Sequence, residues 1–235
     1  MKILRLDQSL RSSNARAVPV KGLFITFEGT EGCGKSTQVK LLGDRLHALG
    51  YHNVLALREP GGTPIGEEIR QMVKHGRRSD AMTAEAELLL MNASRAQLVR
   101  EQIRPALDSG RIVLCDRFYD STTAYQGYGR GLDLKRIRSV IDFAVGETRP
   151  DLTVLLRVPP KLGAERLRSR QSQMAFAPDR IEKEDESFFA RVARGYEAVA
   201  NAEPERVRPI DATGDANTVS AAIWNLVQPI LPPAP

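Results

Sequence analysis

The segment that most constrains the fold of this chain is 29–36, which reads GTEGCGKS and fits the pattern G-x-x-x-x-G-K-[ST]. It follows the short apolar run 23–27 and precedes a stretch with helical character at 35–49. Glycines let backbone N–H groups converge on phosphate oxygens, and the N-terminus of the following helix adds partial positive charge. The segment therefore predicts a strand, a phosphate-binding loop and a helix that together hold a nucleoside triphosphate. The alternative is a glycine-rich turn that only caps a helix.

Each residue of this loop is a candidate phosphate contact. Lys35 is expected to neutralise the β and γ phosphates, and Ser36 to ligate Mg²⁺. The residues that we expect to contact ATP here are Gly29, Thr30, Glu31, Gly32, Cys33, Gly34, Lys35, Ser36 and Thr37.

Strand and helix patterns alternate along the rest of the chain. We expect strands at 23–27, 54–57, 112–115, 152–158 and 207–210, and helices at 35–49, 64–75, 83–108, 134–145, 161–169, 187–202 and 217–231. Strands separated by helices predict right-handed crossovers and an α/β fold, with a parallel five-stranded sheet covered by helices on both faces. No internal repeat or linker divides the chain, so residues 22–235 are expected to form one domain.

Composition excludes several classes of protein. Apolar residues make up 42% and charged residues 27%, as in ordinary globular proteins, and no apolar run approaches the ~18 residues of a membrane span. The net charge is +5, but residues 1–21 hold five basic residues against one acidic, so no basic face for nucleic acid is expected. We expect residues 1–21 to be a disordered extension, with an organellar transit peptide as the alternative. Cys33 and Cys115 lack the spacing of a metal site, which favours a reducing cytoplasm.

A second polar site is expected where the third strand ends. Asp116 and Arg117 follow the apolar run 112–115, and ligands bind at the carboxyl ends of the strands in an open parallel sheet. Asp116 could hold a metal-bound water, and Arg117 could clamp a second phosphate with both guanidinium nitrogens. A salt bridge at the strand end is the alternative. The motifs of a GTPase or motor ATPase are missing from the sequence.

Three further stretches carry a resemblance to a known family: REPGGT at 58–63, LLMNASR at 89–95 and STTAYQGYGRG at 121–131. With the phosphate loop, they make residues 22–231 similar to the bacterial thymidylate kinases. The resemblance implies a P-loop nucleoside monophosphate kinase fold with a mobile lid at about 166–185. It also implies transfer of the γ-phosphoryl group of ATP to dTMP, with Mg²⁺, by a cytoplasmic homodimer.

The same resemblance implies an acceptor pocket formed by Arg58, Met91, Arg95, Arg117, Thr122, Tyr125 and Gln126. Arg58 and Arg117 would contact the acceptor phosphate, and Arg95 would lie near the nucleotide. Thr122 and Gln126 would hydrogen-bond the thymine ring, and Tyr125 would lie under the deoxyribose. For Tyr125 a core aromatic, and for Gln126 a turn residue, remain alternative interpretations.

Two departures from the family pattern matter for mechanism. Met91 stands where the family usually has a phenylalanine that stacks on thymine, so it is either a base contact or a core residue. No arginine lies within the phosphate loop, and the resemblance implies that lid arginines take its place: Arg168, Arg170 and above all Arg180.

Two acidic residues lie in or next to the loop: Glu31 within it and Glu28 at the end of the preceding strand. The family has a carboxylate at the position of Glu31, and a carboxylate there repels phosphate unless a cation or a hydroxyl lies between them. Glu28 is expected to brace the backbone of the loop. The expected catalytic set is Lys35, Arg117, Arg180 and Glu31.

Three other functions remain compatible with parts of this pattern. They are a P-loop deoxynucleoside kinase, another nucleoside monophosphate kinase, and a regulatory module that binds ATP without turnover. A nucleoside acceptor would not require several arginines, and a regulatory module would not require the complete set of phosphate-binding and lid residues.

Overall fold

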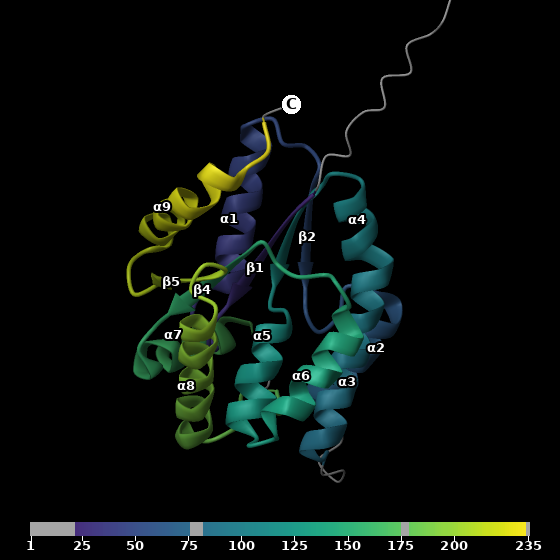
Figure 1. Ribbon diagram of the computed structural model, residues 1–235. Helices are drawn as coiled ribbons and strands as arrows, with labels where there is room; N and C mark the ends of the chain where they lie inside the picture. Colours follow the sequence, from purple (N-terminus) through teal and green to yellow (C-terminus); the bar gives the residue numbers. More distant parts are fainter. Residues whose placement is uncertain (1–21, 76–81, 175–178, 234–235) are drawn as a thin grey trace, which may run out of the picture.

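The computed structural model describes residues 22–75, 82–174 and 179–233, which contain a parallel sheet (Figure 1). Its strands are β1 (Leu23–Glu28), β2 (Val54–Arg58), β3 (Ile112–Asp116), β4 (Leu152–Arg157) and β5 (Val207–Asp211), in the spatial order β2-β3-β1-β4-β5. All four pairings are parallel, so a crossover connects each strand to the next. The predicted α/β class and five-stranded parallel sheet are confirmed. The expected tail, residues 1–21, lies outside the described residues.

Helices cover both faces of this sheet. They are α1 (Lys35–Ala48), α2 (Pro64–His75), α3 (Ala84–Leu98), α4 (Arg104–Asp108), α5 (Tyr119–Thr122), α6 (Leu134–Val145), α7 (Pro160–Met174), α8 (Glu186–Ala202) and α9 (Ala216–Val227). Side chains of β1 alternate between the faces: Ile25 packs in one apolar core with α1 and α9, and Phe24 packs in another with α3 and α6. Because side chains along a strand alternate in direction, a strand buried on both sides is apolar throughout.

The helix expected at 83–108 is interrupted near its end. Thr83 caps α3 by accepting from the N–H of Ala86, as predicted, but residues Val99–Ile103 form a π-helical turn before α4. Pro105 lies just beyond, and a proline has no N–H to continue the i→i−4 ladder. The backbone widens instead, and the N–H of Arg104 donates to the carbonyl of Val99.

Three other segments differ from the expectation. No helix was expected at 119–129, but α5 continues into a π-helical segment, Thr123–Gly129. Helix α7 extends to Met174, so the first half of the expected lid is helical. The last helix ends at Val227, before a short 3₁₀ turn at Gln228–Ile230.

The expected binding edge is formed as the parallel pairing requires. Arg58 lies beside Asp116 in the β2–β3 register, and Phe27 lies on the other side of Asp116 in β1. The ends of three strands therefore bring the phosphate loop, the 58–63 motif and the Asp116-Arg117 pair to one place. Within the described residues, no helix is both long and apolar enough to cross a bilayer.

Candidate functional site

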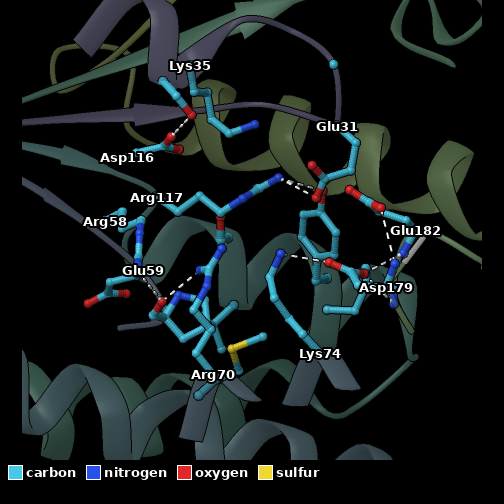
Figure 2. A pocket seen from close by; sticks show the side chains of 18 of the residues that line it. Glu31, Lys35, Arg58, Glu59, Arg70, Lys74, Asp116, Arg117, Asp179 and Glu182 are labelled. Carbon is cyan, nitrogen blue, oxygen red and sulfur yellow. Dashed lines mark hydrogen bonds and ion pairs between the residues drawn. The ribbon is translucent and has the colours of Figure 1, made fainter. Parts of the chain in front are cut away.

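A cleft of about 590 Å³ opens at the carboxyl ends of β1, β2 and β3. Such a volume lies within the range of small-molecule sites. Figure 2 shows Lys35 and Asp116 on one side of the cleft, Arg58, Glu59 and Arg70 on another, and Arg117 between them, directed toward Glu31. Of the predicted residues, those that line the cleft are Glu31, Gly32, Gly34, Lys35, Ser36, Thr37, Arg58, Met91, Arg95, Asp116, Arg117, Thr122, Tyr125 and Gln126.

The phosphate loop has the backbone that its glycines allow. Gly32 has a φ of 73°, and a Cβ placed there would lie 2.2 Å from the carbonyl oxygen of Gly163 in α7. Only glycine fits this position. The Nζ of Lys35 donates to the carbonyl oxygens of Gly29 and Thr30 at 3.1 and 3.0 Å, so the lysine is already folded over the loop.

Oxygen atoms suited to a hard cation lie beside the loop. The hydroxyl of Ser36, the second residue of α1, donates to the carboxylate of Asp116. Mg²⁺ binds through one or two protein oxygens, with waters and substrate phosphates completing its shell. Across the described part of the chain no group of three or more His, Cys, Asp or Glu residues could hold a metal alone. The Ser36–Asp116 pair therefore fits a magnesium ion that arrives with nucleotide.

Arg117 connects the loop to the opposite wall. It has a φ of 71°, unusual for any residue but glycine, and its guanidinium donates to Gly29 O at 3.1 Å, Glu31 Oε1 at 2.7 Å and Tyr125 Oη at 3.2 Å. Burial alone would lower the pKa of Arg117, but the negative charge of Glu31 beside it holds that pKa well above the ordinary value. Glu31 therefore has a cationic partner within the protein itself.

Glu28 braces the turn that orients Arg117. Its carboxylate is fully buried and accepts from Phe118 N at 2.7 Å, Ser121 Oγ at 2.6 Å and Tyr196 Oη at 2.9 Å. Burial, followed by repulsion from Asp120, raises the pKa of Glu28. Tyr196 in α8 also accepts from Arg117 at 3.0 Å, and nothing in the local sequence around it pointed to this site.

Helix α5 and the π-helical segment that follows it place three predicted residues on the wall of the cleft. Thr122, Tyr125 and Gln126 are buried and line the cavity, as residues three and four apart on a helical surface can. The wider turn is closed by the N–H of Arg130, which donates to Tyr125 O at 2.8 Å. π-Turns within helices are frequent at functional sites.

Arg95 enters this wall from α3 as half of a buried ion pair. Its Nε donates to Glu59 Oε2 at 2.7 Å, and both side chains are 3% exposed. Its NH1 donates to Thr122 Oγ1 at 2.8 Å, which ties α3 to the end of α5. Burial raises the pKa of Glu59 to about 7 although Arg95 opposes that shift. Glu59, which the sequence did not single out, orients Arg95.

Cations gather at the end of the cleft formed by β2 and α2. The guanidinium of Arg58 binds both carboxylate oxygens of Glu67, at 2.8 and 3.1 Å. A Cβ on Gly61 would lie 2.3 Å from that guanidinium, so only glycine allows the approach. Burial and the nearby charge of Arg58 lower the pKa of Arg70, which lines the same end with Lys74. Both were missed, although their i, i+4 spacing on α2 could have indicated a shared face.

Other predicted residues lie outside the cavity. Gly29, Thr30 and Cys33 are absent from its lining, and the buried thiol of Cys33 lies beneath the loop. Arg168 is exposed on α7, and the side chain of Arg170 is outside the described part of the structure. Arg180 instead donates to the carboxylate of Glu87 and, at 3.1 Å, to Val73 O.

Comparison with known proteins identifies relatives along most of the chain. A family model described as Thymidylate kinase matches residues 27–223. Thymidylate kinase from Synechococcus sp. (strain JA-2-3B'a(2-13)) is 47% identical over 210 residues, covering 89% of this chain and 96% of that protein. The same-named protein of Syntrophotalea carbinolica is 49% identical over 202 residues, covering 86% and 93%. The crystal structure of thymidylate kinase from Ehrlichia chaffeensis superposes with a TM-score of 0.70 at 32% identity, covering 88% of this chain and 99% of that one.

Proposed function

The chain belongs to the thymidylate kinase family, and from that premise we propose that its cleft transfers the γ-phosphoryl group of ATP to dTMP, giving dTDP. The observation that carries the proposal is the position of Arg117. Its guanidinium contacts the phosphate loop at Gly29 and the acceptor wall at Tyr125, so it lies where donor and acceptor phosphates would meet. Phosphoryl transfer depends mainly on positioning and charge neutralisation, which such a residue supplies.

We propose that the two ends of the cleft hold the two nucleotides. The loop residues and Lys35 would bind the triphosphate, and Ser36 with Asp116, through water, would hold Mg²⁺. When bound, the ion would neutralise charge on the β and γ phosphates. Arg58 would bind the acceptor phosphate, and the clustered charge of Arg70 supports an anion at that end.

The base would lie against Met91, Arg95, Thr122 and Gln126, with the deoxyribose over Tyr125. Met91 is partly buried, lines the cleft and packs at the edge of the core with Tyr125. A base contact and a packing role are therefore compatible in this residue. Its thioether can lie against an aromatic ring with a contact worth ~0.3–1.5 kcal/mol.

For the lid, we propose that Arg180 stabilises charge on the transferring group, helped by Arg168 and Arg170. Because Arg180 is paired with Glu87 in this structure, that role requires the segment to rearrange when ATP binds. Asp179 and Glu182 already line the cleft, and Asp179 pairs with Lys74 at 2.7 Å.

An acceptor series tests the proposed activity. With MgATP as donor, we expect kcat/KM to be highest for dTMP, about tenfold or more lower for dUMP, and lower again for dCMP. A methyl group in an apolar contact is worth ~1–3 kcal/mol, which sets this scale. ADP release in a coupled assay gives the values.

Each alternative function predicts a different result in the same assay. Thymidine accepted as well as dTMP would indicate a deoxynucleoside kinase, and dCMP or dGMP at the rate of dTMP would indicate another monophosphate kinase. ATP binding without ADP release for any acceptor would indicate a regulatory module.

We also propose that the protein is a homodimer. Helix α3 packs between α2 and α6, and all three helices expose large apolar side chains. These are Ile65 and Met72 on α2, Leu89 on α3 and Phe143 on α6. Phe143 is 84% exposed, which is unfavourable unless another surface covers it. Light scattering is expected to give twice the 26.0 kDa chain mass for the wild-type protein. Phe143→Asp is expected to shift the protein toward the 26.0 kDa monomer. A monomer at micromolar concentration would contradict the proposal.

A further inference from the structure

A buried carboxylate below the base wall was described above only as the partner of Arg180. Glu87 lies in the first turn of α3, and its side chain is 1% exposed. It accepts from Gln126 Nε2 at 2.7 Å, from Arg130 Nε and NH2 at 3.3 and 3.1 Å, and from Arg180 NH2. Glu87 does not line the cleft, whereas Gln126 does.

Only one orientation of the Gln126 amide is compatible with this carboxylate. Burial alone would raise the pKa of Glu87, but hydrogen bonds and charges from Arg130, Gln126 and Arg180 hold that pKa below its ordinary value. An ionised carboxylate accepts hydrogen bonds and cannot donate them. The amide group of Gln126 that faces Glu87 must therefore be the NH₂, and the carbonyl oxygen is the group left for the cleft.

We propose that Glu87 is a positioning residue for base selection: it fixes the Gln126 amide so that the pocket presents an acceptor to the ring. This inference rests on the proposed function. The N3 position of thymine carries a hydrogen and donates, whereas N3 of cytosine carries a lone pair. An oxygen held in this orientation pairs with the first and faces the lone pair of the second. A site built to pair with a polar group rejects an analogue that leaves that group unpaired.

The chain provides a matched control in Arg130. Its guanidinium makes two bonds to Glu87 and one to Glu184 at 2.6 Å, but it does not line the cleft. Arg130→Lys removes the forked hydrogen bonds of the guanidinium from the Glu87 cluster but keeps a positive charge beside the carboxylate, so Glu87 stays ionised and still accepts from Gln126. Both variants weaken the cluster, but only Glu87→Gln frees the Gln126 amide to turn.

The decisive measurement is the ratio of kcat/KM for dTMP to that for dCMP. Glu87→Gln replaces the carboxylate with an amide that can donate or accept, so Gln126 can turn either way. We expect Glu87→Gln to lower the ratio at least tenfold and Arg130→Lys to change it less than threefold. An unchanged ratio in folded Glu87→Gln, or an equal fall in Arg130→Lys, would overturn the inference.

A measurement on the wild-type chain covers the case in which Glu87→Gln does not fold. The side-chain amide signals of Gln126, assigned by their loss in Gln126→Met, should exchange with solvent at least tenfold more slowly than those of the exposed Gln71. Equal exchange would overturn the inference. Failure of the proposed function looks different, because the wild-type protein would then show no preference for dTMP at all.

Discussion

Lys35→Met is expected to lower kcat by roughly 100- to 1,000-fold, the scale for removal of one charged group that stabilises a transition state. Lys35 is buried, with 7% of the residue exposed, and its Nζ is held over the loop by Gly29 O and Thr30 O. Incoming phosphate oxygens would take over from these carbonyls, and charge grows on them as the γ-phosphoryl group leaves. Methionine keeps the length and packing of the side chain without the charge. Steady-state kinetics with MgATP and dTMP measures the effect.

Lys40→Met is the control for this substitution. Lys40 lies on the same helix, α1, but its side chain is 76% exposed and pairs with Asp44. Surface ion pairs contribute about 0–1 kcal/mol, so we expect kcat and melting temperature close to those of the wild type. If Lys35→Met instead raises only the KM for ATP and leaves kcat intact, Lys35 binds the ground state and does not act in transfer.

The fold could be predicted from the sequence where one periodic pattern determined one element. All five expected strands are present, and the three central ones, β1, β3 and β4, were indicated by apolar runs because a strand covered on both faces is mostly apolar. The phosphate loop was located correctly because its glycines and its position between β1 and α1 are both local features. Parallel pairing then brought Arg58 beside Asp116, although 58 residues separate them in the sequence numbering.

Segments without a local signal were missed. The stretch 119–129 is rich in glycine, threonine and tyrosine and has no helical apolar repeat, yet it folds into α5 and a π-helical turn. The π-helical turn packs against α8, and this tertiary packing stabilises a helical conformation that the residues' own helix propensity does not favour. The end of α7 was missed for the same reason, since residues 170–174 are mainly polar.

Long-range partners explain the remaining differences at the site. Arg180 is 93 residues from Glu87, and no spacing rule connects a lid arginine to a buried carboxylate on α3. Glu59 and Tyr196 likewise act through Arg95 and Arg117, which is visible only in the folded chain. The sequence therefore predicts the residues that line the cleft better than the residues that hold them in place.

The second large effect is expected for Arg117→Lys, which should lower kcat by at least about 100-fold although the charge is conserved. Arg117 donates to five groups on three sides, among them Gly29 O, Glu31 Oε1 and Tyr125 Oη. A lysine has three donors on one nitrogen and cannot reproduce the planar fork. Glu31 would then lose its partner and would repel the phosphate groups that it faces. Kinetics with varied dTMP should also show a raised KM.

Arg206→Lys separates this effect from a loss of folding. Arg206 is also a forked, mostly buried arginine, 12% exposed against 14% for Arg117, and its NH1 and NH2 bind both carboxylate oxygens of Asp120 at 2.7 and 2.9 Å. It does not line the cleft. Because both variants break a buried guanidinium network, both should lower the melting temperature, but Arg206→Lys should keep kcat within about threefold. Equal losses of kcat in the two variants would mean that Arg117 supports the fold and takes no direct part in transfer.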